Sequence, residues 1–222
     1  RTHKKLAIAL AILVVLVIGG GVATALYFLN KSEPTVTSTT KKEEAKPVIH
    51  YSPLTGAKVD TEDITKQAVT AIMLENSPDA RPQSGLKDSG VVFEAVAEGG
   101  ITRFLALYQE QKPELVGPVR SLRMYYVDWL TPFNASVAHV GGSAAALAQV
   151  RNGTYRDIDQ FFNAGTYWRA TDRYAPHNVY TSFERLDELN KAKGFTESTF
   201  TGFVRKDSTP AEVPAATNIN VS

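Results

Sequence analysis

The chain has 222 residues, of which 43% are hydrophobic, and it contains no cysteine. The lack of cysteine excludes a disulfide scaffold, a Cys-ligated metal site and a thiol nucleophile. Of the 24 Lys and Arg and the 23 Asp and Glu, seven and three lie in the first 46 residues, which leaves 17 basic and 20 acidic side chains in the rest. We expect no nucleic-acid partner, because binding to a phosphate backbone needs a concentrated basic face.

An uncharged apolar segment, LAIALAILVVLVIGGGVATALYFL, occupies residues 6–29. A helix of this length at about 1.5 Å per residue reaches roughly 36 Å and exceeds the bilayer core of about 30 Å. Residues 1–5 are basic, and the positive-inside rule places such an end in the cytoplasm. We expect a single-pass transmembrane helix in the cell membrane, with a cytoplasmic tail and an extracellular remainder. A signal peptide cleaved after the Ala23-Thr24-Ala25 motif is the alternative, and it also exports the remainder.

Residues 30–46 (NKSEPTVTSTTKKEEAK) contain almost nothing apolar and predict a disordered stalk. Residues 47–208 follow as the expected extracytoplasmic domain. Residues 209–222 end in an alternating pattern and are interpreted as the start of a second, truncated domain.

Strand and helix signals alternate through residues 47–208. The β-branched run at 68–74 predicts a buried strand, and the runs at 91–98 and 101–110 around Gly99-Gly100 predict a hairpin. A short strand is expected at 135–140. Helices are expected after three capping residues, which are Ser121, Ser143 and Thr181, the last with Glu184 as a capping box. The mixture predicts a mixed α/β fold, a layered β-sheet and helix sandwich preceded by one transmembrane helix.

Four motifs in the same order carry a resemblance to a known family: FEAVAEGGITRFLALYQ, VGPVRSLRMYYVDW, AHVGGS and YWRATDRYAPHNVYTS. They resemble the YerB-like family of bacterial envelope proteins, many of them described as lipoproteins, and its N-terminal domain of unknown function 3048. The resemblance covers roughly residues 51–206. It implies a layered α/β fold followed by a second, mainly β domain, but the family supplies no agreed catalytic residues. The chain lacks the cysteine that a lipoprotein acylates.

The hairpin places charged residues across from each other. With Gly99-Gly100 as the turn, Arg103 should face Val96 and share a face with Glu94 and Glu98. One interpretation is a cross-strand salt-bridge ladder, a second is a surface that contacts substrate, and a third is a catalytic pair of Glu94 and Glu98. Four strand residues span about 13 Å, whereas glycosidase carboxyl groups stand about 5 to 9.5 Å apart, and this disfavours the catalytic pair.

The motif VAHVGGSAAAL predicts a strand that leads through Gly141-Gly142 into a helix capped by Ser143. Amide groups at such a helix start can hold an anion. His139 would stand beside them as a ligand or, more weakly, as a catalytic group. The alternative is a tight turn with His139 as a hydrogen-bonded structural residue.

Arginine replaces lysine between residues 103 and 173, where seven Arg accompany a single Lys. Guanidinium groups suit carboxylates or phosphates held at two points. The alternative is that these arginines tie loops to the core. The candidate ligand-binding residues are Arg103, Arg120, Arg123, His139, Gly142, Ser143, Arg173, His177 and Asn178.

These observations predict a domain that binds an anionic cell-envelope ligand, peptidoglycan or teichoic acid, in a Gram-positive-type envelope. The alternatives are a wall-glycan hydrolase using Glu94 or Glu98, and an interaction module for another envelope protein. The four histidines form no metal motif, and GxSxG is absent. We therefore expect no metal and no cofactor, and the sequence assigns no reaction.

Overall fold

The computed structural model describes residues 48–204 continuously, with scattered residues between 8 and 30 and between 206 and 220. Two compact units are present, residues 1–47 and 48–222. In the first unit, the described residues between 8 and 27 are helical. Within what is described, no helix combines the length and apolar character needed to cross a bilayer. Much of the expected span 6–29, most of 209–222 and, apart from Asn30, the whole expected stalk lie outside the described residues.

A five-stranded sheet with the order β4-β5-β3-β6-β7 forms the centre of the second unit. Its strands are β3 (Thr70–Glu75), β4 (Val91–Glu98), β5 (Ile101–Tyr108), β6 (Ser136–His139) and β7 (Arg156–Asp159). Strands β3, β6 and β7 are parallel, and β5 is antiparallel to β3 and β4. The carboxyl ends of β3, β6 and β7 therefore meet the start of β5 at one edge, where open α/β sheets commonly bind ligands.

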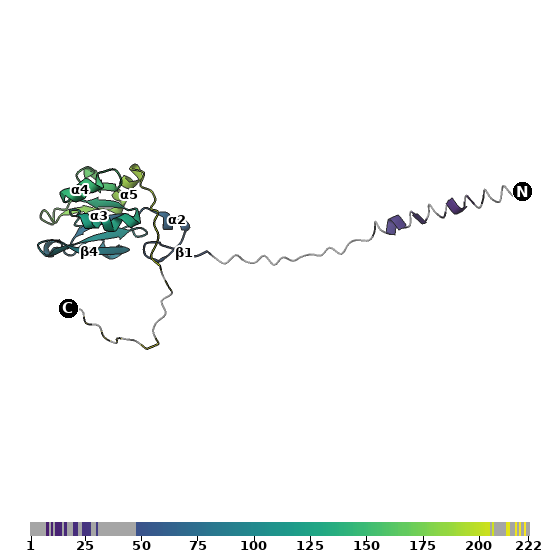
Figure 1. Cartoon of the computed structure of the whole chain (residues 1–222), viewed down its shortest axis with the longest axis horizontal. Coiled ribbons are helices and arrows are strands. Elements are labelled where there is room, and N and C mark those ends of the chain that lie inside the picture. The colour runs from purple at the N-terminus through teal and green to yellow at the C-terminus, as the bar shows by residue number, and fades with distance from the viewer. Residues whose placement is uncertain are drawn as a thin grey trace. The chain divides into compact units, whose positions relative to one another are not determined.

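Helices cover both faces of this sheet. Helices α3 (Met124–Leu130) and α4 (Ala144–Val150) pack their buried side chains against Met73, Leu105 and Val137. On the other face, Phe183 and Leu186 of α5 (Phe183–Ala192) pack against a second core cluster that contains Ile72, Leu74 and Ala106. Figure 1 shows α3 lying across the sheet and β4 at one side of the domain. The observed fold is mixed α/β in three layers.

Smaller elements complete the unit. Strands β1 (His50–Tyr51) and β2 (Lys58–Val59) pair beside α2 (Glu62–Lys66), and β8 (Tyr167–Arg169) pairs with β9 (Val179–Thr181). Single 3-10 turns occur at Pro78–Ala80, Leu86–Asp88, Thr131–Phe133 and Ala164–Thr166.

The expected strands and hairpin are confirmed, but two helix starts differ. Helix α3 begins after Arg123 rather than after Ser121. Helix α5 is capped by Ser182, whose hydroxyl accepts from the Arg185 amide, because Thr181 still belongs to β9 and donates to the Thr166 carbonyl. Ser143 caps α4 as expected, with its hydroxyl accepting from the Ala146 amide.

Candidate functional site

Two buried residues of opposite charge lie across from each other at the carboxyl end of β3 and on β5. Glu75 and Arg103 are directly opposite each other on β3 and β5, and each residue is 5% exposed. Opposed residues on neighbouring strands project to the same face of a sheet. Burial lowers the pKa of the Arg103 guanidinium, and the negative charge of Glu75 opposes that shift. The end of an apolar strand therefore holds an ion that its neighbours must compensate.

Three further side chains gather on the Glu75 carboxylate. Ser77 donates its hydroxyl to Oε1 at 3.0 Å, and His177 Nδ1 lies 2.9 Å from Oε2. Arg120 Nε lies 3.3 Å from the same Oε2, yet this buried nitrogen has no aligned hydrogen bond. Burial lowers the pKa of Arg120, and the negative charge of Glu75 offsets only part of this shift. Segments far apart in the chain thus converge on one carboxylate.

The imidazole of His177 is oriented by this carboxylate. Because a carboxylate accepts hydrogen bonds, Nδ1 carries the proton that it shares with Glu75. The Ser77 hydroxyl lies 3.4 Å from the same nitrogen, Nδ1, and is 3% exposed. A serine nucleophile needs the opposite ring nitrogen and access to substrate, so these residues do not form a Ser-His-Glu triad. Within the described chain, Nε2 has no partner, and the side chain is 22% exposed.

Glu98 joins two arginines next to this group. Arg103 donates through Nη2 to Glu98 Oε2 at 2.6 Å and through Nη1 to the Ser121 carbonyl at 3.0 Å. Arg123 contacts Glu98 Oε1 through both Nε, at 2.7 Å, and Nη2, and it donates to the Leu122 carbonyl. Both oxygens of Glu98 are therefore occupied.

Glu94 does not share this environment. A bulge between Val96 and Glu98 shifts the register, so Arg103 faces Ala95 and Glu94 faces Phe104. The expected pairing of Arg103 with Val96 was wrong, because the bulge interrupts the unbroken ladder that the Gly-Gly turn alone predicts. Glu94 instead accepts from Thr102, at 2.6 Å, and from Asn76. Of the two hairpin glutamates, Glu98 forms an ion pair with Arg103 and Glu94 does not.

His139 belongs to a separate buried cluster. Its Nε2 lies 2.9 Å from Asp157 Oδ1, and its Nδ1 lies 2.7 Å from the Gly141 carbonyl. Asp159 accepts from the Gly141 amide and from Arg151. His139 and Asp159 are fully buried, so the arrangement matches the structural interpretation of His139. Among the described residues, no hydrogen bond or ion pair joins the His139 side chain to Arg120 or His177, although the neighbouring Val140 amide donates to the Arg120 carbonyl.

The remaining candidates serve local structure in their described contacts. The Ser143 amide donates to the Leu122 carbonyl, and Gly142 packs closely against Leu122. Arg173 donates to the carbonyls of Asp79 and Pro82, and the Asn178 amide donates to those of Ala170 and Arg173. Of the predicted ligand-binding residues, four lie together around Glu75 and Glu98: Arg103, Arg120, Arg123 and His177.

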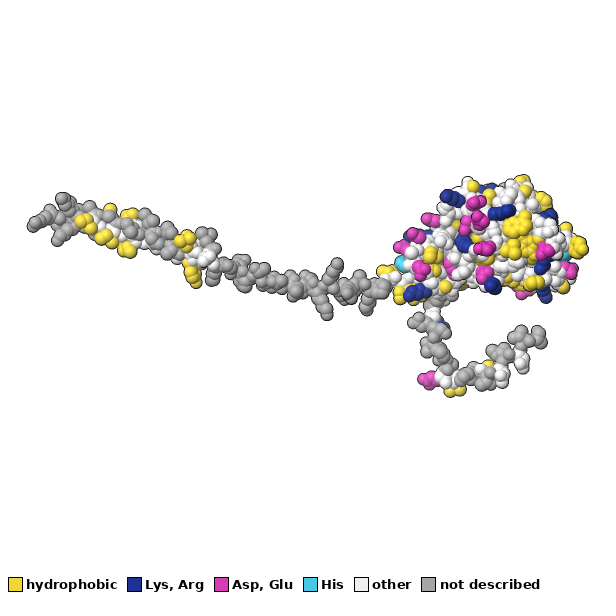
Figure 2. Space-filling model, turned by 180° about the vertical axis from the view of Figure 1, so that it is seen from behind, with side chains coloured by type: hydrophobic (Ala, Val, Ile, Leu, Met, Phe, Trp, Pro, Cys, Tyr) yellow, Lys and Arg dark blue, Asp and Glu magenta, His cyan; other side chains and the backbone are white. Residues whose placement is uncertain are grey.

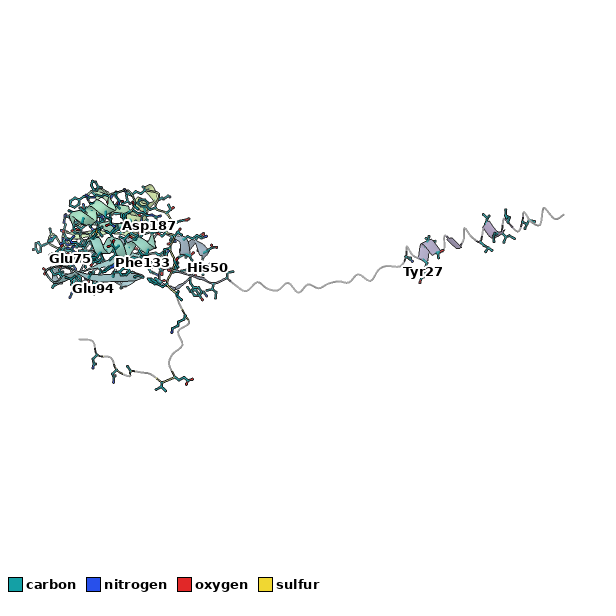
Figure 3. All side chains as sticks on the ribbon, in the orientation of Figure 1. Tyr27, His50, Glu75, Glu94, Phe133 and Asp187 are labelled. Carbon is teal, nitrogen blue, oxygen red and sulfur yellow. The ribbon has the colours of Figure 1, made fainter. Side chains whose placement is uncertain are left out.

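The hub of this cluster, Glu75, was missing from the predicted ligand-binding set. In the sequence, Glu75 is marked only by its place as a single carboxylate between a predicted buried strand and the turn Asn76-Ser77. Strand pairing with β5 was needed to show that Arg103 stands opposite it. Figure 3 places Glu75 and Glu94 at one end of the domain, away from His50.

Two hollows among the described residues border other elements. One of about 850 Å³ is lined at the start of α5 by Lys112, Trp168, Arg185 and Asp187 among others. Another of about 350 Å³ shares Trp168 and includes Arg173 and Tyr180. Figure 2 shows basic and acidic side chains interspersed around an apolar patch on one face. Within the described residues, no group of three His, Asp or Glu could hold a metal ion.

Chemically, this edge of the sheet presents two groups with unused donors or acceptors, the Arg120 guanidinium and His177 Nε2. Arg120 Nη1 makes one long contact of 3.4 Å to the Pro176 carbonyl, and its side chain is 22% exposed. We name Glu75, Ser77, Arg120 and His177 the Glu75 site. It can contact an anion, and His177 can exchange a proton with it.

Comparison with known proteins supplies the family. Residues 54–196 match the model described as "Protein of unknown function (DUF3048) N-terminal domain". The chain is 41% identical over 145 residues to a protein named "Putative lipoprotein YerB" from Bacillus subtilis, covering 65% of this chain and 44% of that protein. The crystal structure of Bacillus subtilis YerB superposes with a TM-score of 0.65 at 40% identity, covering 69% of this chain and 53% of that one. The chain thus spans about half the length of the relatives that it matches, and it belongs to the DUF3048 family through its N-terminal domain.

Proposed function

We propose that this chain is a membrane-anchored extracytoplasmic protein that binds an anionic cell-envelope polymer, such as peptidoglycan or teichoic acid. The observation that carries the proposal is Arg120, a partly exposed guanidinium at the Glu75 site whose Nη1 makes a single long contact, 3.4 Å to the Pro176 carbonyl. Arg103 and Arg123 add two guanidinium groups to the two carboxylates of Glu75 and Glu98. The group has an excess of positive charge in a slightly acidic domain.

Two observations support the proposed location at the membrane. Residues 6–29 have the length and apolar character of a span, with basic residues before them. A relative carries the name lipoprotein, which describes a protein held at a membrane. Extraction of cell membranes with alkaline carbonate tests the anchor: an integral chain stays in the membrane pellet, and release into the supernatant contradicts the proposal.

Binding is tested by sedimenting the full chain, in mild detergent, with purified cell walls. Arg120→Gln should lose about tenfold or more of the affinity, the value of a charge-assisted hydrogen bond of about 1.5 kcal/mol or more. Arg156→Gln is the matched control, because Arg156 lies on β7 and donates to the Glu197 carbonyl. Equal affinity of both variants and the parent chain would remove Arg120 from the binding site.

A protein-interaction module is the second candidate. Phe161 and Phe162 are 69% and 71% exposed directly after β7, and adjacent exposed aromatic residues are typical of contact surfaces. The glycan-hydrolase alternative receives less support, because Glu98 is paired with two arginines and Glu94 accepts from Thr102. The supernatant of the same wall incubation, analysed for released glycan fragments, separates a hydrolase from a binder.

A further inference from the structure

We infer that the Glu75 site takes up a proton on His177 when it binds its anion, and that the anion is a phosphodiester. This inference rests on the proposed function and specifies the chemistry of the same site. Its starting observation is that Arg120 and His177 share one carboxylate oxygen, Glu75 Oε2, at 3.3 and 2.9 Å.

The first step concerns the direction of the imidazole. Glu75 holds the Nδ1 proton, and Ser77 donates to the other carboxylate oxygen, so the carboxylate is held on both sides. The two nitrogens of an imidazole lie on opposite sides of the ring. Nε2 is therefore turned away from Glu75, and it has no partner within the described chain. It is the ring nitrogen that remains for a ligand, on a side chain that is 22% exposed.

The second step concerns charge. The ionisable groups around His177 are Glu75 on β3 and Arg120 on the segment before α3, and Arg103 on β5 stands opposite Glu75. Arg103 is itself paired with Glu98. Glu75 and Arg120 together are neutral while His177 is neutral, and they carry one net positive charge when Nε2 is protonated. A monoanion is attracted to the second state, so binding and proton uptake are linked.

The third step concerns the shape of the anion. Arg120 and His177 come from separate chain segments, so no shared backbone holds their donors in one plane. A carboxylate accepts hydrogen bonds best near its own plane. The two charged oxygens of a phosphodiester sit on a tetrahedral phosphorus and accept hydrogen bonds over a wide range of directions around each P–O bond, so each can take one donor. Two donors matched to two oxygens favour a diester over a phosphate monoester, which has a third charged oxygen.

The test is calorimetric titration of the full chain with dimethyl phosphate, whose single negative charge does not change between pH 5.5 and 8. Affinity should rise as the pH falls, approaching about tenfold per pH unit where His177 is neutral in the free protein. Buffers with different ionisation enthalpies should report uptake of up to one proton. His177→Gln should bind without proton uptake, and His50→Gln, which changes a histidine at the other end of the domain, should behave as the parent chain (Figure 3).

The failure of the inference and the failure of the proposed function give different results. Binding that is lost in Arg120→Gln but shows no proton uptake in the parent chain overturns the inference and leaves the anion-binding proposal standing. The absence of dimethyl phosphate and wall binding at every pH overturns both. Tighter binding of acetate than of dimethyl phosphate contradicts the phosphodiester assignment.

A readout on the unmodified chain avoids dependence on the folding of a variant. In long-range proton-nitrogen NMR spectra near pH 7, addition of dimethyl phosphate should move the His177 Nε2 signal toward the protonated position. Nδ1 should stay protonated throughout, because Glu75 retains it. A His177 signal that does not respond to saturating ligand overturns the inference.

Discussion

His177 Nδ1 lies 2.9 Å from Glu75 Oε2, although 102 positions separate the two residues in the chain. The contact joins the loop before β9 to the end of the central strand β3. It orients an imidazole whose second nitrogen remains available, and it shares its carboxylate oxygen with Arg120. The proposed binding chemistry depends on this single junction between distant segments.

The Glu75 carboxylate should contribute strongly to stability. Glu75→Gln keeps the shape of the side chain but leaves the buried Arg103 with less compensation, so we expect a loss of about 3 kcal/mol in the free energy of unfolding. Urea denaturation followed by circular dichroism measures it. Glu94→Gln is the control, since its exposed carboxylate should cost less than about 1 kcal/mol. Equal losses in the two variants would mean that Glu75 is not the electrostatic hub.

The hairpin turn makes a conformational demand that a variant can test. Gly99 and Gly100 have φ angles of 56° and 76°, and an added Cβ at either position meets no neighbouring atom. Gly100→Val should therefore cost about 1–2 kcal/mol through backbone conformation alone. Gly165→Ala is the control, because it also has open space and lacks a positive φ. An unchanged urea midpoint for Gly100→Val would contradict this turn.

Local patterns predicted the elements better than their register. The hairpin and the Ser143 cap follow from neighbouring residues, and the structure confirms both. The bulge near Val96 depends on how β4 is held against β5 and α3, where Tyr125 and Tyr126 donate to the carbonyls of Val96 and Ala95. No spacing in the hairpin itself indicates these contacts.

The site was predictable only in part for a related reason. The arginine-rich composition pointed to Arg103, Arg120 and Arg123, which do share one edge of the sheet. Glu75 and His177 meet through tertiary packing between segments that are remote in sequence. His139 had an equally suggestive local setting, but the neighbouring strand β7 supplies Asp157 as its partner.

Acid should weaken the His139 cluster. Burial raises the pKa of Asp157, but the hydrogen bond and charge of His139, the Asp159 amide and Arg151 together lower it below 3.8. A lowered folded-state pKa gives stability that is complete above the unfolded value and is lost as the pH falls through the folded value. The free energy of unfolding should therefore fall more steeply below about pH 4 in the parent chain than in Asp157→Asn. Parallel pH profiles would show that Asp157 is not responsible.

Alkali should act on Tyr126, whose hydroxyl lies 2.7 Å from the Arg103 carbonyl oxygen and 3.1 Å from that of Ala95 and shares its one proton with them. Burial raises its pKa to about 12. Stability from a raised pKa is present below the unfolded value of about 10 and is lost as the pH rises through about 12. Tyr126→Phe should lose about 1–2 kcal/mol at pH 7 and show less further loss above pH 10. An unchanged alkaline profile would assign the sensitivity to another tyrosine.

Substitutions at Arg123 and Arg120 should distinguish an effect on stability from an effect on binding. Arg123 is committed to Glu98 and to the Leu122 carbonyl, and it is the residue from which α3 begins. Arg123→Ala should therefore lower the free energy of unfolding by about 1–3 kcal/mol and reduce wall affinity per folded molecule much less than Arg120→Ala does. Arg120→Ala should show the opposite pattern, because its guanidinium retains open donors. Urea denaturation and wall sedimentation on the same preparations measure both quantities. If Arg123→Ala lost affinity while keeping its stability, the binding surface would lie at Glu98 and the start of α3 instead of at Glu75.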